Sequence, residues 1–213
     1  GPGTVDFDAT RVYFFGHSQG SNVGIPAIAV TDLAPAAVFS GAGSVLIEGI
    51  LTKKSPVDAR AGLELLVGER LGGGHPVMVL WQTFFDRIDP INYSPMLIRQ
   101  PPPGVASKHV LLPWGRGDTF SPETTMNNTA LAAGLLIADP VVSPITGLVL
   151  DPRPVTTTPG VLGGDGQRRL GAIFQYDGQM AFDGHFVSTR VNQAISDWRA
   201  FFVSVAGGAP AVP

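Results

Sequence analysis

One serine, one histidine and one aspartate of this chain have the types and the order that nucleophilic chemistry needs. Ser18 lies in the pentapeptide GHSQG at 16–20, which fits the pattern G-x-S-x-G; an apolar run at 12–15 precedes it and small residues at 21–30 follow. In that pattern a buried strand ends in a strained turn, exposes the serine hydroxyl and restarts as a helix. Side chains at the two flanking glycine positions would collide with the strand or the helix. The alternative is an ordinary turn in which Ser18 caps the helix.

A serine hydroxyl becomes a nucleophile when a base takes its proton and a carboxylate orients that base. Asp118 follows an apolar run at 109–112, and His185 follows another at 172–176. The three residues therefore occur in the order Ser, Asp, His, each just after a predicted strand. Because parallel strands present their carboxyl ends at one edge of a sheet, we predict that Ser18, Asp118 and His185 converge there.

Three other carboxylates compete for the orienting role. Asp86 and Asp89 lie in the segment between the second and third apolar runs, where acids are more often solvated or paired within helices. Asp183 lies two residues before His185, which is too close in sequence to approach the far side of the ring easily. We therefore favour Asp118. The remaining histidines, His75 and His109, are interpreted as structural or surface residues.

The elements that must position these residues follow an α/β pattern. Short apolar runs alternate with helix-like stretches, which is typical of a parallel sheet covered by helices on both faces. The predicted strands are 12–15, 36–40, 109–112 and 172–176, and the predicted helices are 21–30, 55–71, 121–138 and a last one from Ser188 onward. We expect a single domain over 1–213, with a long surface loop at about 141–169 and a frayed tail at 207–213.

Composition excludes several other classes of protein. The chain has 213 residues, of which 44% are hydrophobic and 15% charged, so disorder is not expected. The net charge is −3 with no basic run, which gives nucleic acid no binding surface. No apolar stretch reaches the length of a membrane span. Because cysteine is absent and no His, Asp or Glu cluster has metal-ligand spacing, we expect no disulfide, no metal and no cofactor.

At these residues the chain resembles the α/β-hydrolase superfamily, and its pentapeptide is most similar to those of the lipase and esterase branches. The resemblance implies Ser18 as nucleophile, His185 as general base and Asp118 as the residue that orients it. It also implies that the backbone N–H of Gln19 supplies one donor of the oxyanion hole. The four predicted strands then correspond to strands five to eight of the family's sheet, with a cap inserted at about 44–105.

The chain departs from the family at its beginning. About half of the family's domain normally precedes the serine turn, including the loop that gives the second oxyanion donor. Either this sequence is a fragment of a longer protein, or it is a truncated hydrolase that completes itself by association. The strand at 12–15 would then be a sheet edge with no lysine or proline inside it. We expect a homodimer or larger homo-oligomer that covers this edge.

The resulting hypothesis is a serine hydrolase that cleaves carboxylic esters through an acyl-enzyme. His17 and the cap aromatics Trp81, Phe84 and Phe85 are expected to bind the substrate, which favours small molecules with apolar acyl or aryl groups. For each aromatic taken alone, a place in the core is the stronger alternative. Two other functions stay open: a non-catalytic half-domain that binds an apolar ligand or a missing partner chain, and a triad enzyme that transfers acyl groups or hydrolyses activated phosphate esters.

Overall fold

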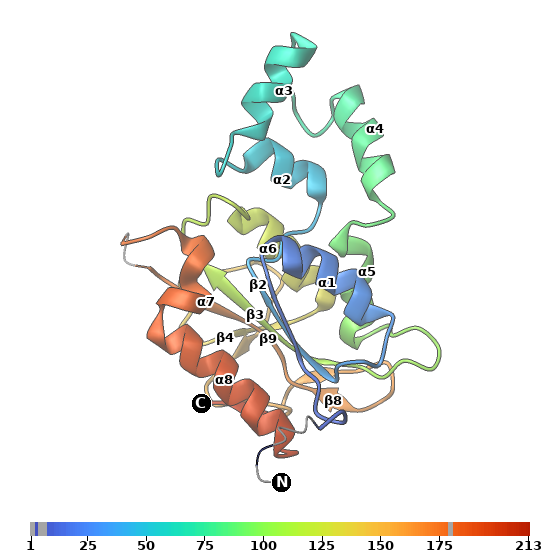
Figure 1. The fold of residues 1–213 in the computed structure, drawn as a ribbon, viewed down its shortest axis with the longest axis vertical. Helices are drawn as coiled ribbons and strands as arrows, with labels where there is room; N and C mark the ends of the chain where they lie inside the picture. Colours follow the sequence, from blue (N-terminus) through green and yellow to red (C-terminus); the bar gives the residue numbers. More distant parts are fainter. Residues whose placement is uncertain (1–2, 4–7, 179–180) are drawn as a thin grey trace.

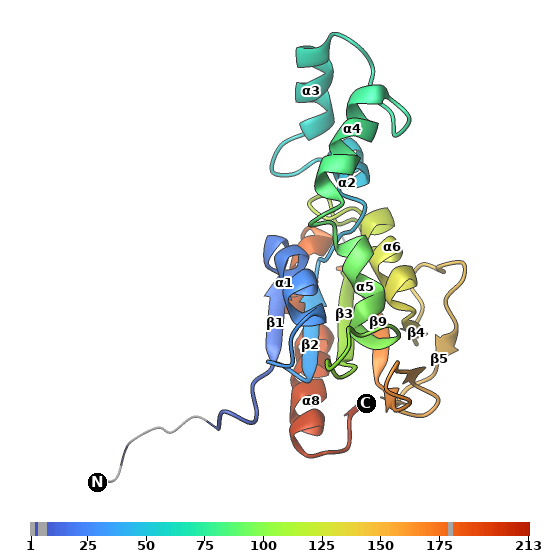
Figure 2. The ribbon, with the colours of Figure 1, turned by 90° about the vertical axis from the view of Figure 1, so that its right-hand side faces the viewer.

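The computed structural model of the protein describes residue 3 and residues 8–178 and 181–213. Within these residues six parallel strands form one sheet in the order β1-β2-β3-β9-β4-β5 (Figures 1 and 2). The strands are β1 (Phe14–His17), β2 (Ala36–Ser40), β3 (His109–Gly115), β9 (Gly171–Tyr176), β4 (Leu136–Ala138) and β5 (Leu150–Asp151). The four strands predicted from the sequence are thus neighbours in this sheet, which confirms the α/β fold class.

Helices cover both faces of this sheet (Figure 1). One face carries α1 (Gln19–Ala29), α5 (Pro90–Ile98) and α6 (Glu123–Ala133), and the other carries α7 (Val187–Arg190) and α8 (Asn192–Ala206). Successive strand residues point to opposite faces, so in β2 Ala37 and Phe39 pack under the first set of helices while Ala36 and Val38 pack under the second. Each face therefore has its own apolar core.

Three further helices project beyond the strand ends (Figures 1 and 2). They are α2 (Leu46–Thr52), α3 (Ala59–Val67) and α4 (Pro76–Phe85). They share a small apolar cluster in which Met78 and Leu71 are fully buried. By contrast, α5 packs on α1 and α6 against the sheet. We refer to 46–85 as the cap helices; the wider cap at about 44–105 stays a prediction.

Several predicted helix boundaries are wrong. The helix expected to run to 138 ends at Ala133, because Gly134 adopts a left-handed conformation with φ 67° and the chain continues as β4. The helix expected from Ser55 begins at Ala59, where the Asp58 side chain accepts a hydrogen bond from the backbone N–H of Ala61. Ser188 does not cap the last helix, since it lies inside the short helix α7.

The expected long loop and frayed tail contain short pieces of strand. Within 141–169 the chain forms β5, β6 (Val155–Thr156), β7 (Val161–Leu162) and β8 (Arg168–Arg169). In the tail, β10 (Ala211–Val212) pairs antiparallel with β6, and Val212 is buried. The prediction of a frayed tail is therefore wrong. In the described part of the chain no helix has the length and apolar character needed to cross a membrane.

The first residue of β3 should make the stability of the fold depend on pH. Burial, together with the positive charge of Arg169 and against the opposing effect of Asp165, lowers the pKa of His109 to about 4. Its Nδ1 accepts a hydrogen bond from the backbone N–H of Leu170 at 3.0 Å, which requires the neutral ring. In the unfolded chain the pKa of histidine is about 6.5. As pH falls, His109 is therefore protonated at a higher pH in the unfolded state than in the folded state.

We predict that His109 stabilises the fold fully above pH 6.5 and that this contribution falls by about 3 kcal/mol between pH 7 and pH 4. Urea unfolding of the protein and of His109→Gln at pH 7, 5.5 and 4 measures it. The difference in unfolding free energy between the two proteins should shrink as pH falls. A difference that stays constant with pH would contradict the prediction.

Candidate active site

The backbone at Ser18 is strained in the way that the sequence pattern predicts. Ser18 stands between β1 and α1 with φ 56° and ψ −125°, a conformation that residues with a side chain rarely adopt. At Gly16 an added Cβ would lie 2.9 Å from both the carbonyl oxygen of Gly20 and the Cα of Ser21. The crowding predicted at Gly16 is thus confirmed. At Gly20 the prediction is wrong, because an added Cβ would meet no described atom within 4 Å.

The half-buried side chain of Ser18 is not a helix cap. Its backbone carbonyl accepts from the N–H groups of Ser21 and Asn22, but its hydroxyl makes no capping hydrogen bond in the described structure. The capping alternative is therefore wrong. Gln19 is the first residue of α1, where a backbone N–H has no partner inside the helix. Among the described residues this N–H has no hydrogen-bond partner, and it lies beside the serine at the positive end of the helix dipole.

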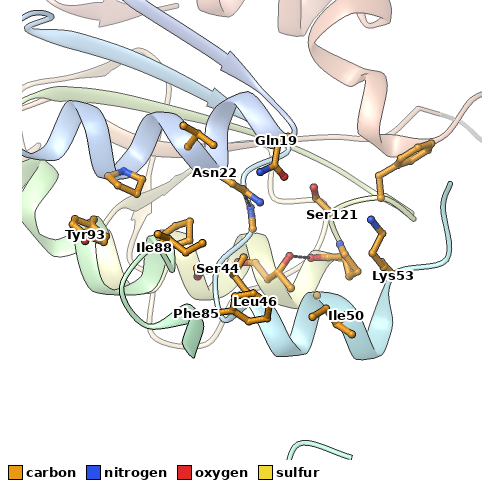
Figure 3. Close-up of a pocket in the computed structure, with 18 of the residues that line it drawn as sticks. Gln19, Asn22, Ser44, Leu46, Ile50, Lys53, Phe85, Ile88, Tyr93 and Ser121 are labelled. Carbon is orange, nitrogen blue, oxygen red and sulfur yellow. Dashed lines mark hydrogen bonds between the residues drawn. The ribbon is translucent and has the colours of Figure 1, made fainter. Parts of the chain in front are cut away.

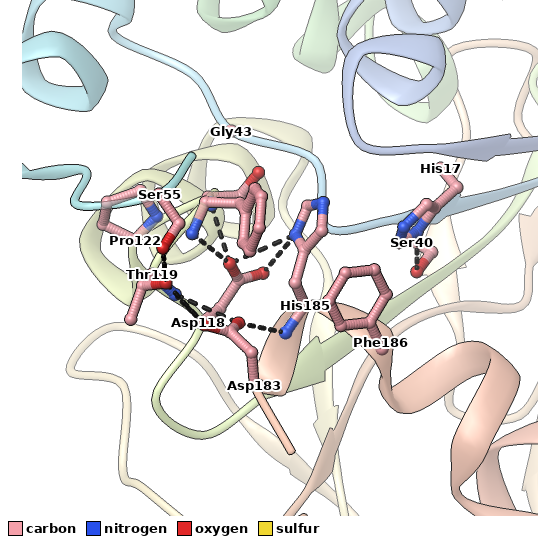
Figure 4. A network of polar contacts seen from close by, with 12 residues as sticks. His17, Ser40, Gly43, Ser55, Asp118, Thr119, Pro122, Asp183, His185 and Phe186 are labelled. Carbon is pink, nitrogen blue, oxygen red and sulfur yellow. Dashed lines mark hydrogen bonds and ion pairs between the residues drawn. The ribbon is translucent and has the colours of Figure 1, made fainter. Parts of the chain in front are cut away.

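His185 and Asp118 form a buried hydrogen-bonded pair (Figure 4). The Nδ1 atom of the ring lies 2.9 Å from Oδ2 and 3.1 Å from Oδ1 of the carboxylate. Asp118 also accepts from the backbone N–H groups of Phe120 and Ser121, at 2.9 and 2.7 Å. Because a carboxylate only accepts, the pairing places the Nδ1 proton on His185 and leaves its Nε2 free to take another proton.

The competing carboxylates have other partners. Asp183 accepts from the backbone N–H of His185 at 2.9 Å and binds both the N–H and the hydroxyl of Thr119, so it fixes the backbone under the ring rather than the ring itself. Asp89 is buried and accepts from the N–H groups at the start of α2 and α5. Asp86 is exposed and accepts from Gln82. Of the four candidates, Asp118 contacts the His185 ring.

Phe120 and Gly41 lie close to the His185 ring. Phe120 stacks on it with ring centres 4.7 Å apart and an angle of 17° between the planes. Gly41, at the end of β2, has φ +57°, and a Cβ there would lie 3.1 Å from the Cε1 and Nδ1 atoms of the ring. A glycine is required here both by its conformation and by the close approach of the ring. Neither Phe120 nor Gly41 was expected, although Gly41 directly follows the predicted strand at 36–40.

His17 lies beside His185, with ring centres 4.6 Å apart. Its Nδ1 is 3.1 Å from the hydroxyl of Ser40, which in turn is 2.5 Å from the hydroxyl of Ser188 (Figure 4). Burial, reinforced by His185 and opposed by Asp118, lowers the pKa of His17 below its usual 6.5. The neutral ring therefore joins the serine turn to the segment that follows His185. Ser40 was not predicted as a site residue, and Ser188 was predicted only as the cap of the last helix.

Ser18 follows His17 directly, at the same edge of the sheet as His185 and Asp118. In the described structure the Ser18 hydroxyl forms no hydrogen bond with His185. Catalytic hydrogen bonds are often long in free enzymes and tighten when substrate binds. The pair between His185 and Asp118 is thus observed, whereas transfer of a proton from Ser18 to His185 stays a prediction.

A pocket of about 610 Å³ opens beside Gln19 (Figure 3). Its walls come from α1, the β2–α2 connection, α2, the α4–α5 connection and the start of α6. Among the residues that line it are Leu46, Ile50, Ile88 and Tyr93, together with Phe120. Most of the exposed wall is therefore apolar.

The expected substrate-binding residues are divided between this pocket and other places. Phe85 lines the pocket. Trp81 packs in the apolar cluster of the cap helices, and the Phe84 side chain is 76% exposed. Among the described lining residues neither of these two occurs, nor does His17. Their part in substrate binding stays a prediction. In the described part of the chain, no three His, Asp or Glu side chains are grouped so that they could hold a metal ion.

No protein-family model matches the chain, and no curated protein matches it. Among solved structures it is similar to a puromycin-hydrolysing peptidase of Mycobacterium tuberculosis, with 17% identity and a TM-score of 0.49 over 92% of this chain and 22% of that one. It is also similar to acetyl xylan esterase 1 of a Thermoanaerobacterium species, with 14% identity and a TM-score of 0.44 over 80% of this chain and 41% of that one. The chain spans less than half the length of either protein.

The order of elements in the chain can be compared with the resemblance drawn from the sequence. The parallel strand β1 leads through the strained Ser18 into the helix α1. Asp118 follows β3, and His185 follows β9, which lies next to β3 in the sheet. This mainly parallel sheet, flanked by helices, is consistent with a truncated α/β-hydrolase-like fold. This agrees with the resemblance drawn from the pentapeptide and from the order of Ser18, Asp118 and His185.

The pairing of His185 predicts a spectroscopic signature. A ring N–H that is buried and bound to a carboxylate gives a proton resonance at unusually low field. We expect Asp118→Asn to abolish this resonance, because the amide cannot replace the charge that favours the Nδ1 proton. Asp183→Asn is the matched control and should retain it, since an amide oxygen still accepts from the backbone N–H of His185. Retention of the resonance in Asp118→Asn would contradict the pairing.

Proposed function

We propose that the protein hydrolyses carboxylic esters, with Ser18 as nucleophile, His185 as general base and Asp118 as the residue that orients the base. The observation that supports this most directly is the buried contact between His185 Nδ1 and the Asp118 carboxylate, at 2.9 Å. The strained backbone of Ser18, whose hydroxyl is not used for capping, adds to it. A structural histidine alone would not explain why both features occur at one edge of the sheet.

The proposed reaction has two halves. The Ser18 oxygen bonds to the acyl carbon while His185 Nε2 takes the hydroxyl proton, and His185 then gives this proton to the leaving alcohol as the ester C–O bond breaks. A water molecule attacks the acyl-enzyme, transfers one proton to His185 and releases the acid as the proton returns to Ser18. Throughout, Asp118 holds the Nδ1 proton in place and stabilises the positive ring.

The negative oxygen of the tetrahedral intermediate needs donors. The backbone N–H of Gln19 is suited to this, because it is the first N–H of α1 and lies at the residue after the nucleophile. Removing one such donor costs roughly a hundred- to a thousandfold in rate in known enzymes. The mostly apolar pocket beside Gln19 supports a preference for apolar acyl or aryl groups.

We predict that Ser18→Ala lowers the rate of hydrolysis of 4-nitrophenyl butanoate by about a thousandfold or more. Ser196→Ala is the matched control, because Ser196 is an exposed serine on α8. A fluorophosphonate probe should label the protein and the Ser196→Ala variant stoichiometrically and leave Ser18→Ala unlabelled. Equal hydrolysis by Ser18→Ala and the protein would refute the proposal.

The same assay distinguishes the other functions. A non-catalytic half-domain would neither hydrolyse the ester nor react with the probe. An acyltransferase would form a new ester when a competing alcohol is added, at the expense of the free acid. An enzyme for activated phosphate esters would release 4-nitrophenol from a 4-nitrophenyl phosphodiester faster than from the butanoate.

We also propose that the protein self-associates through β1. In the described structure β1 is an edge strand that pairs with β2 alone, and the side chains of Val12 and Phe15 are 49% and 38% exposed. An apolar edge of this kind favours pairing with another chain. We predict a dimer or larger assembly by light scattering, and a shift to monomer in Val12→Lys. The control Val149→Lys, at the opposite side of the sheet, should not shift. A monomeric protein would refute self-association.

A further inference from the structure

The pocket beside Gln19 has a positive character that the whole chain lacks. The chain carries a net charge of −3. Lys53 and Arg87 nevertheless both line the pocket, and no Asp or Glu is present among its described lining residues. A positively charged pocket favours negatively charged ligands. The apolar walls alone do not explain the two cations.

Lys53 carries one of these positive charges at the wall of the pocket. It follows the last residue of α2 and is half-buried, and its amino group points toward Ser121 (Figure 3). In the described part of the chain the amino group has no hydrogen-bond or ion-pair partner. Its neighbour Lys54 differs, because the Lys54 amino group lies 2.7 Å from the Asp58 carboxylate. The two adjacent lysines therefore differ in their contacts: Lys54 is paired with a carboxylate, whereas Lys53 lines the pocket.

Other donors of the pocket also lack protein partners. Asn22 uses its side-chain oxygen to accept from the backbone N–H of Gly43, at 2.9 Å. This assignment leaves its amide NH₂ group without a partner among the described residues. Ser121 is 8% exposed, and its hydroxyl likewise has none. These donors and the half-buried cation are therefore available to hydrogen-bond to a ligand that enters the pocket and displaces water.

The apolar part of the pocket defines the rest of the ligand. Ile88 and Tyr93 lie at the end of the pocket away from Lys53, and Leu46 lies between (Figure 3). A ligand that fills the whole pocket is thus amphiphilic, with an anionic group at one end and an apolar chain or ring at the other. Gln19, beside the proposed nucleophile, lies on the same side of the pocket as Ser121 (Figure 3).

We infer, on the basis of the proposed esterase function, that the substrate is an ester that carries an anionic group and that Lys53 binds this group. A carboxylate on the acyl part and one on the alcohol part present the same chemistry to Lys53. The structure thus assigns Lys53 as a specificity-determining residue, which acts on the choice of substrate rather than on the bond that breaks.

Two matched pairs of esters test the inference. The first pair is mono-4-nitrophenyl adipate and its neutral methyl ester, with the charge on the acyl part. The second pair is 4-butanoyloxybenzoate and its methyl ester, with the charge on the alcohol part. The measured quantity is the ratio of kcat/KM for the anionic ester to that for its neutral partner. We expect a ratio above one in at least one pair, and the pair that shows it identifies the part that carries the charge.

The variant Lys53→Met should lower this ratio about tenfold, the size of one charge-assisted hydrogen bond. Lys53→Arg should preserve most of it. Lys54→Met is the matched control and should leave it unchanged, because Lys54 pairs with Asp58 outside the pocket. Added salt should reduce the ratio in the protein more than in Lys53→Met. A ratio that is the same in the protein and in Lys53→Met in both pairs would overturn the inference while the esterase function stands.

A binding measurement keeps the two proposals separate if no ester is hydrolysed. Calorimetry on Ser18→Ala, which should not turn over, compares decanoate with decanol. Tighter binding of decanoate that is lost in the double variant with Lys53→Met would support the anion site even though the esterase proposal had failed. Equal binding of both ligands, or equal binding by both variants, would overturn the anion site.

Discussion

The contact between Asp118 and His185 depends on how closely two loops pack at the ends of β3 and β9. The strands are paired up to Gly115 and Tyr176, and the loop that follows each then folds over the same edge. An added Cβ at Gly115 would lie 2.0 Å from the carbonyl oxygen of Gly184. Because both positions are glycine, the two backbones can pack together without this clash, and the carboxylate reaches Nδ1 of the ring within the protein interior.

The strain at Ser18 is held by the same edge. The backbone N–H of Ser18 donates to the carbonyl of Ser40 at 2.9 Å, and the hydroxyl of Ser21 donates to the same carbonyl. The end of β2 thus fixes the turn from one side while Gly16 lets α1 pack against it from the other. A strained residue persists only where its surroundings determine its conformation completely. These contacts supply that determination and keep the hydroxyl on the outside of the turn.

The sequence predicts the parts of this site that depend on chain order and periodicity. The placement of Ser18, Asp118 and His185 at one edge could be predicted because each follows an apolar run and parallel strands end at one edge. The crowding at Gly16 followed from the type of turn. What could not be predicted depends on tertiary contacts: the extra strands β4 and β5 are too short to give a periodic signal. The end of α6 at Ala133 was missed because Gly134 lies within an otherwise helix-like stretch.

The pocket residues were harder to predict for the same reason. Aromatic content identified the cap as a candidate wall, but only the fold decides that Phe85 faces the pocket while Phe84 faces solvent. Lys53 looks like any surface lysine in the sequence, next to an identical residue. Its difference from Lys54 arises from where α2 ends and from the position of Asp58, and neither is encoded in a local pattern.

The cap helices are hydrogen-bonded to the loop that carries Asp118, and this links the pocket to the proposed catalytic residues. The backbone N–H groups of Lys54 and Ser55 donate to the carbonyl of Thr119, at 2.8 and 3.0 Å. The Thr119 hydroxyl contacts both Ser55 and Asp183, and Asp183 holds the backbone of His185. A displacement of the chain at Lys53 is therefore transmitted through Thr119 to Asp118, and through Thr119 and Asp183 to His185. The position of the pocket cation and the orientation of the imidazole are set by the same few hydrogen bonds.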